Sequence, residues 1–153
     1  MKRGREEFDD IKKFFDVCGK DKDMVQVQEF IERGVDVNYV GGGRFEEYTA
    51  LHFAAAYGHV DVAKVLIENG ADVNAVSKGL NITALYCAAL NGHVDVAKVL
   101  IQNDADVNAA SKSNWTPLHS AASNGHVDVA KVLIENGADV NAVDINKWKW
   151  TPL

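Results

Sequence analysis

The feature that most constrains this chain is a stretch of eighteen residues that occurs three times. "GHVDVAKVLIENGADVNA" begins at Gly58 and recurs letter for letter from Gly125, and a copy from Gly92 differs only at Gln102 and Asp104. The copies are therefore offset by 34 and 33 residues. A period of this length is typical of a solenoid of small stacked units rather than of a single closed core.

Each copy, together with the segment before it, predicts two short helices. The first follows a threonine that is a suitable N-cap, as in "TALHFAAAYGHV", and ends at the glycine that opens the copy. The second covers "VDVAKVLIEN", where Asp61, Lys64 and Glu68 share one face and the other positions of the helix are mostly apolar. About two thirds of the circumference of this helix should therefore be shielded from solvent, as expected for a helix with a neighbour on each side.

The second helix should end on a left-handed residue. Gly70 and Gly137 stand at this position in two copies, and glycine adopts that conformation freely. Asp104 replaces the glycine in the middle copy, and aspartate tolerates the conformation better than most residues. We expect a local cost below about 1 kcal/mol at Asp104.

The complete unit "TPLHSAASNGHVDVAKVLIENGADVNA" resembles the ankyrin repeat, with its TPLH start, paired helices and GADVN exit. The resemblance implies an all-α repeat solenoid of stacked helix-turn-helix units with β-turn or hairpin fingers between them. The chain is then one domain, with a capping repeat over residues 1–38, repeats over 39–74, 75–108 and 109–141, and the start of a truncated repeat over 142–153.

The two terminal units depart from the pattern. "MVQVQEFIERGVDVN" aligns with the second helix and exit of the later units, with Gly34 matching Gly70 and Asn38 matching Asn74. Its first helix is expected over "EEFDDIKKFFDVC", which is more polar, as a cap requires. The final "WKWTPL" opens another repeat, so the array is either cut short or ends in a vestigial unit. We expect an uncapped apolar face there, which would fray or pair with another molecule.

Composition and charge limit the function classes. The formal charge of −6 argues against a general nucleic-acid or anionic-membrane binder. The chain has two cysteines, no apolar run of membrane-spanning length and no apolar segment typical of a signal peptide near its start. We therefore expect a monomeric, reduced cytoplasmic protein without membrane association. A pathogen effector exported by a route that needs no such signal would have the same pattern.

The sequence predicts no catalytic residue, cofactor or metal. His59, His93 and His126 recur once per repeat, and packed helices about 8–10 Å apart cannot bring them to a single zinc ion. In the resembled family, the Thr and His of the TPLH start bond locally, which here concerns His52 and His119. Asp72, Asp106 and Asp139 are expected to form local turn bonds. Cys87 is expected to be exposed but not activated.

What differs between the repeats is the segment from each exit Asn to the next Thr. In ankyrin repeats this segment forms a finger, and fingers and first helices line the concave face where partners bind. The spans are eleven, nine, eight and ten positions for Asn38–Thr49, Asn74–Thr83, Asn108–Thr116 and Asn141–Thr151. Three fingers are therefore longer than the eight that matches the family, and function tends to collect in such loops.

The fingers carry large apolar residues and cations, and aromatic residues and arginine are enriched at interface hot spots. Variable first-helix positions would extend the same surface. We predict a protein-binding surface formed by Arg44, Phe45, Tyr48, Phe53, Tyr57, Lys78, Leu80, Ile82, Leu90, Asn91, Lys112, Trp115, Ser120, Ser123, Asn124, Lys147, Trp148 and Trp150. For the residue before each Thr, such as Tyr48, Ile82 and Trp115, the alternative is packing against the neighbouring finger.

Three functions fit these observations. The first is a non-catalytic adaptor or scaffold that binds a protein partner. The second is a ligand or nucleic-acid reader that stacks bases or sugars on Lys/Trp fingers, and its polyanion binding would weaken steeply with salt. The third is a targeting segment of a larger enzyme or secreted effector. The resemblance favours the first.

Overall fold

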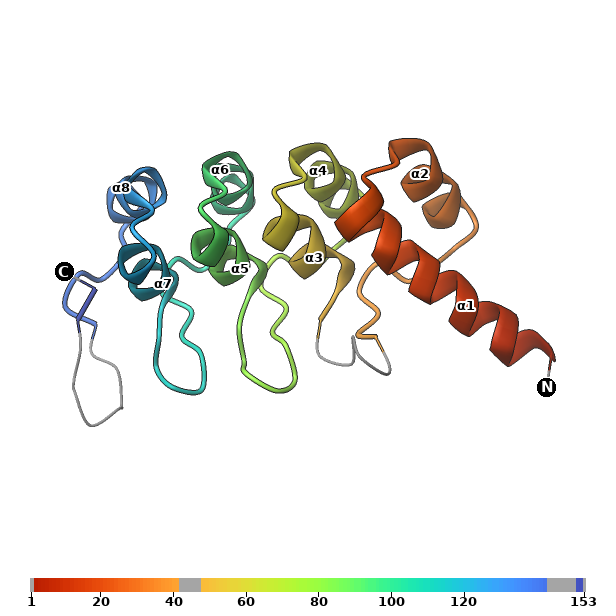
Figure 1. Cartoon of the computed structure of the whole chain (residues 1–153), viewed down its shortest axis with the longest axis horizontal. Helices are drawn as coiled ribbons and strands as arrows, with labels where there is room; N and C mark the ends of the chain where they lie inside the picture. Colours follow the sequence, from red (N-terminus) through yellow and green to blue (C-terminus); the bar gives the residue numbers. More distant parts are fainter. Residues whose placement is uncertain (1, 42–47, 143–150, 153) are drawn as a thin grey trace.

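The computed structural model describes residues 2–41, 48–142 and 151–152, with side chains from residue 9 onward except at 21. Helix pairs stack side by side along the long axis of the molecule (Figure 1). The helices are α1 (Lys2–Asp16), α2 (Met24–Glu32), α3 (Ala50–Tyr57), α4 (Val60–Glu68), α5 (Ala84–Asn91), α6 (Val94–Gln102), α7 (Pro117–Ser123) and α8 (Val127–Glu135). The described residues contain no strand, so the predicted all-α repeat solenoid is confirmed.

The helices form two layers. The first helices α3, α5 and α7 lie in one layer with the fingers below them, and α4, α6 and α8 lie in the other (Figure 1). Small residues allow the first helices to approach closely, since Ala54, Ala55, Ala88 and Ala89 are completely buried. Fully buried leucines at equivalent positions then fill the space between the layers: Leu51, Leu85 and Leu118 from the first helices, and Leu66, Leu100 and Leu133 from the second.

The predicted helix ends are confirmed. Thr49, Thr83 and Thr116 are the N-caps of α3, α5 and α7. Gly70 and Gly137 have left-handed φ angles of 88° and 89°, and Asp104 adopts the same conformation with φ 64°. The predicted turn bonds also form, because the carboxylates of Asp72, Asp106 and Asp139 each accept from the backbone N–H two residues later.

Two ladders of hydrogen bonds join successive repeats, and neither was predicted from the sequence. In one, the Asn38 side chain donates to the Gly70 carbonyl (2.9 Å) and accepts from the Asp72 N–H (2.7 Å). Asn74 and Asn108 repeat this pair of bonds one and two units later. The recurring exit asparagine was the signal that could have predicted this ladder.

The second ladder uses the histidine that follows each inter-helix glycine. The Nε2 atoms of His93 and His126 lie 3.0 Å from the Ala56 carbonyl and 3.1 Å from the Leu90 carbonyl of the preceding repeat. Because a carbonyl only accepts, Nε2 carries the proton in both rings. These histidines therefore join repeats. His59 differs, because its buried Nε2 has no partner among the described residues.

The N-terminal unit differs from the prediction in its first helix. Helix α1 begins at Lys2 rather than at Glu6 and continues into a π-helical turn over Val17–Asp21. The glycine of this turn is tightly packed, since a Cβ at Gly19 would lie 3.3 Å from the Cβ of Phe53. The predicted matches of Gly34 to Gly70 and of Asn38 to Asn74 are confirmed, because Gly34 is left-handed and Asn38 makes the same pair of bonds as Asn74. Within the described residues, no helix has the length and apolarity needed to cross a bilayer.

Candidate functional site

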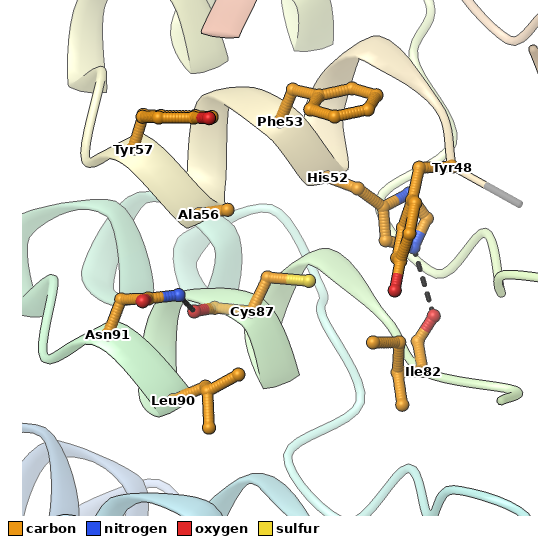
Figure 2. Close-up of a pocket in the computed structure, with 9 residues that line it drawn as sticks. All are labelled: Tyr48, His52, Phe53, Ala56, Tyr57, Ile82, Cys87, Leu90 and Asn91. Carbon is orange, nitrogen blue, oxygen red and sulfur yellow. Dashed lines mark hydrogen bonds between the residues drawn. The ribbon is translucent and has the colours of Figure 1, made fainter. Parts of the chain in front are cut away.

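Two adjoining hollows open on the concave face, which we define as the layer of α3, α5 and α7 with the fingers. The first has a volume of about 410 Å³, lies between α3 and α5 (Figure 2), and is lined by Tyr48, His52, Phe53, Ala56, Tyr57, Ile82, Cys87, Leu90 and Asn91. The second has a volume of about 320 Å³ and is lined by Tyr48, Leu80, Ile82, Tyr86, Leu90, Ser111, Lys112, Ser113 and Trp115. The hollows share Tyr48, Ile82 and Leu90 and so form one continuous depression.

Aromatic rings from α3 and its preceding finger form one wall of the first hollow. Tyr48 and Phe53 meet edge to face, with ring centroids 5.8 Å apart. Phe53 is supported from behind by Phe15 of the capping unit, at 5.6 Å. Tyr57 stacks on His59 at 6.1 Å and keeps 48% of its surface exposed. The wall is therefore rigid at Phe53 and open to solvent at Tyr57.

His52 lies deep in the first hollow and is held by its local backbone. Its Nδ1 accepts from the Thr49 N–H (3.1 Å) and lies 2.8 Å from the Thr49 hydroxyl. Its Nε2 donates to the Ile82 carbonyl at 2.9 Å (Figure 2). Burial lowers the pKa of His52 below its ordinary 6.5, and the Ile82 bond opposes this only in part. A neutral, fully bonded ring of this kind positions neighbours and is not available as a base.

The expectation for Cys87 is wrong, because this side chain is buried rather than exposed. It retains 6% of its surface and projects from α5 into the space between the two first helices (Figure 2). Burial raises the pKa of its thiol to about 12, so the thiolate is scarce at neutral pH. The equivalent positions in the other repeats are Phe53 and Ser120. This position of the first helix faces the preceding repeat, as Phe53 does toward Phe15 and Cys87 toward α3.

The second hollow is built mainly by two fingers that share a backbone design. In the finger over 75–82, the Ser77 N–H donates to the Ile82 carbonyl (2.9 Å) and the Ser77 hydroxyl accepts from the Ile82 N–H (3.2 Å). Ser111 and Trp115 make the same pair of bonds in the next finger, at 2.8 Å and 3.2 Å. The fingers are thus closed turns without strands.

The two fingers are also bonded to each other. The Lys112 N–H donates to the Leu80 carbonyl at 3.0 Å, and the Asn81 side chain donates to the Ala110 carbonyl at 3.2 Å. The indole of Trp115 stacks on His119, with centroids 5.8 Å apart. These contacts hold Leu80 in place although 55% of its surface is exposed.

The structure brings half of the predicted contact residues together. Nine line the hollows: Tyr48, Phe53, Tyr57, Leu80, Ile82, Leu90, Asn91, Lys112 and Trp115. Three are exposed outside the linings: Lys78, Ser123 and Asn124. Five lie outside the described residues: Arg44, Phe45, Lys147, Trp148 and Trp150. Whether any of these residues binds a partner stays a prediction.

Two predicted contact residues are buried. Ser120 retains 0% of its surface, so the prediction that it extends the binding surface is wrong. It occupies the same register as Cys87 and points away from solvent for the same reason. Ile82 is exposed by only 6% and supports the depression from beneath, in agreement with the packing alternative.

Six lining residues were not predicted from the sequence, namely His52, Ala56, Tyr86, Cys87, Ser111 and Ser113. Four of them belong to the first helices, namely His52, Ala56, Tyr86 and Cys87. Ala56, Tyr86 and Cys87 lie one helical turn from the predicted Phe53 or Leu90, and this spacing was the signal that could have found them.

The chemistry of the two hollows suits non-covalent contact. Among the described residues, their linings contain no carboxylate, and the one charged residue is Lys112. Among the residues that the structure describes, no group of three or more His, Cys, Asp or Glu side chains comes together as a metal site. What the depression offers is apolar and aromatic surface with a cation at one end.

Comparison with family models identifies the repeats independently. A model of the ankyrin repeat matches residues 46–78, and a model of ankyrin repeats in three copies matches residues 74–144. Comparison with individual curated proteins gave no match. Ankyrin repeats are generally protein–protein interaction modules and are typically non-catalytic. Since the two matches together cover well over half of its 153 residues, the chain belongs to the ankyrin-repeat family.

Proposed function

We propose that this chain is a non-catalytic adaptor that holds a protein partner on its concave face, with the two adjoining hollows as the anchor site. The observation that carries the proposal is the continuous depression from Tyr57 to Lys112. Interfaces take most of their affinity from a few well-packed aromatic and apolar anchors, and depressions of this kind receive them.

Exposed apolar surface within the depression supports the proposal. Tyr57, Leu80 and Leu90 are exposed by 48%, 55% and 41%, although each lies beside buried neighbours. Clustered exposed apolar residues with a polar rim are typical of interaction sites. In the other layer, by contrast, the second helices present Asp61, Lys64 and their equivalents to solvent.

Rigidity also supports the proposal. The fingers are bonded within themselves and to each other, and Phe53 is packed against Phe15. A preorganised surface loses little conformational entropy on binding, so more of the contact energy becomes affinity. The monomeric state and the cytoplasmic location expected from the sequence stay predictions.

Affinity capture from an extract of the source cells tests the proposal. A variant with Tyr57→Ala and Leu90→Asp should lose the partners that the unmodified chain captures, since it removes one anchor surface and places a charge between the hollows. Val25→Asp is the matched control, because Val25 is 69% exposed on α2, outside both hollows. Circular dichroism should show that both variants keep their helices. If both variants lost the captured partners equally, or if both retained them, the concave face would be rejected as the binding site.

A further inference from the structure

Resting on that proposed function, we propose that the depression recognises a protein segment in which large apolar side chains are accompanied by an acidic side chain. The apolar side chains occupy the two hollows. The acidic side chain lies at Lys78 and Lys112, which we call the lysine pair. The proposal thus names the chemistry of the partner and the side of the depression at which its charge lies.

Of the lysine pair, Lys112 lines the second hollow and Lys78 lies on the neighbouring finger. The Lys112 Nζ donates to the Lys78 carbonyl at 3.4 Å, so the two fingers are in contact. Both side chains are exposed. Within the described part of the chain, neither ammonium has a carboxylate within 4.0 Å, whereas the capping unit pairs Arg33 with Asp10.

The surrounding charges make this pair distinctive. The whole chain carries a formal charge of −6, and the residues that the structure describes in the linings of both hollows include no Asp or Glu. Two lysines on neighbouring fingers, without an acidic partner among the described residues, attract a carboxylate more strongly than one exposed lysine would when both ammonium groups reach the same charge. Charge complementarity of this kind sets orientation and suppresses partners of the wrong sign.

Backbone pairing is a poor alternative for the partner's recognition. The N–H groups of Ser77, Ile82 and Lys112 already donate within or between fingers, as do those of Ser111 and Trp115. A partner strand would find few free donors there, so the fingers do not act as a sheet edge. Side chains that fill the hollows and one that meets the lysine pair are therefore the main source of specificity.

The size of the hollows agrees with side chains rather than with a nucleic-acid backbone. Volumes of about 410 and 320 Å³ are near the lower end for small-ligand pockets and suit one or two large side chains each. A nucleic acid would instead require a basic track along the face, and the described lining supplies one cation.

A phage-displayed library of random peptides, selected on the full chain and on two charge-reversed variants, tests the inference. Lys78→Glu with Lys112→Glu reverses the lysine pair. Lys64→Glu with Lys98→Glu makes the same change in net charge on exposed positions of α4 and α6 and serves as the control. Peptides selected on the unmodified chain and on the control should combine large apolar residues with Asp or Glu. Peptides selected on the reversed pair should carry Lys or Arg in place of the acid.

The affinities of the selected peptides for the unmodified chain and for the two variants test the inference quantitatively. An acidic peptide should bind the reversed lysine pair about tenfold more weakly than the unmodified chain, and the control variant within about twofold. Peptides that depend on Leu90 but show no preference for acid, or an unchanged selection on the reversed pair, would overturn this inference and leave the proposed function standing. If no selected peptide is sensitive to Leu90→Asp, both fail. Displacement of the peptides by a short single-stranded oligonucleotide at physiological salt would overturn the inference in favour of a nucleic-acid reader.

Discussion

Replacing Gly92 by Ala should destabilise the fold more than replacing Gly125 by Ala, although the two backbones are nearly identical. Their φ angles are 75° and 72°, so each substitution carries the same left-handed strain of roughly 1–2 kcal/mol. A Cβ at Gly92 would also lie 2.6 Å from Nδ1 and 2.8 Å from Cε1 of His126. No described atom lies within 4 Å of a Cβ at Gly125.

The additional cost at Gly92 follows from the displaced ring. If the His126 ring shifts, its bond to the Leu90 carbonyl is lost, which costs about 1 kcal/mol. Forcing a methyl group into the contact adds about 1–3 kcal/mol of overpacking. Gly92→Ala should therefore cost about 2–4 kcal/mol more than Gly125→Ala, a large fraction of the 5–15 kcal/mol typical of a domain.

Urea unfolding followed by far-ultraviolet circular dichroism measures these free energies. His126→Ala provides the second arm of a double-mutant cycle, because removing the ring removes the clash. In that background, Gly92→Ala should cost no more than Gly125→Ala does. Equal costs for the two glycine substitutions in the unmodified chain, or a Gly92→Ala cost that persists without the His126 ring, would refute this account of how repeats dock.

Three further predictions concern stability, protonation and thiol reactivity. Asp104→Gly should relieve left-handed strain, raising the free energy of unfolding by up to about 1 kcal/mol and Tm by about 2–4 °C; an unchanged melting curve would contradict this. His52 has a lowered pKa when folded, so its neutral form stabilises the fold fully above pH 6.5, and stability should fall as pH drops below that value. Urea midpoints measured from pH 7 to pH 5 should show a weaker decline in His52→Tyr, which introduces the residue found at position 86. Burial raises the pKa of the Cys18 and Cys87 thiols to about 12, so iodoacetamide should modify them only after unfolding, as mass spectrometry would show; rapid labelling of the folded chain would place a thiol at the surface.

Most of the helical array could be predicted because its signals are local and recur. Three signals act within a few residues: a threonine cap, an inter-helix glycine and a left-handed residue after the second helix. Each of them recurs in every repeat, which strengthens the prediction. The same reasoning covered Asp104, whose side chain tolerates the conformation of the glycine it replaces. Interactions between residues close in sequence were therefore sufficient to predict the helices and most of their ends.

Burial within the concave face could not be predicted in the same way. Cys87 and Ser120 sit at variable positions of the first helix, and variability suggested exposure. Both are buried because this register faces the preceding repeat, whereas Leu90, three residues after Cys87, lines both hollows and stays 41% exposed. The burial of these two side chains depends on residues of another repeat about one period away in the sequence. The pattern within a single helix does not reveal those contacts.

Site-specific photo-crosslinking tests the central claim most directly. Benzoylphenylalanine placed at Leu90 reports contacts in the depression, and the same group at Lys98 reports the other layer of the same repeat. Irradiation in the presence of captured partner should crosslink the partner from position 90 and leave position 98 at background. Crosslinking from position 98 that equals or exceeds that from position 90 would contradict binding on the concave face.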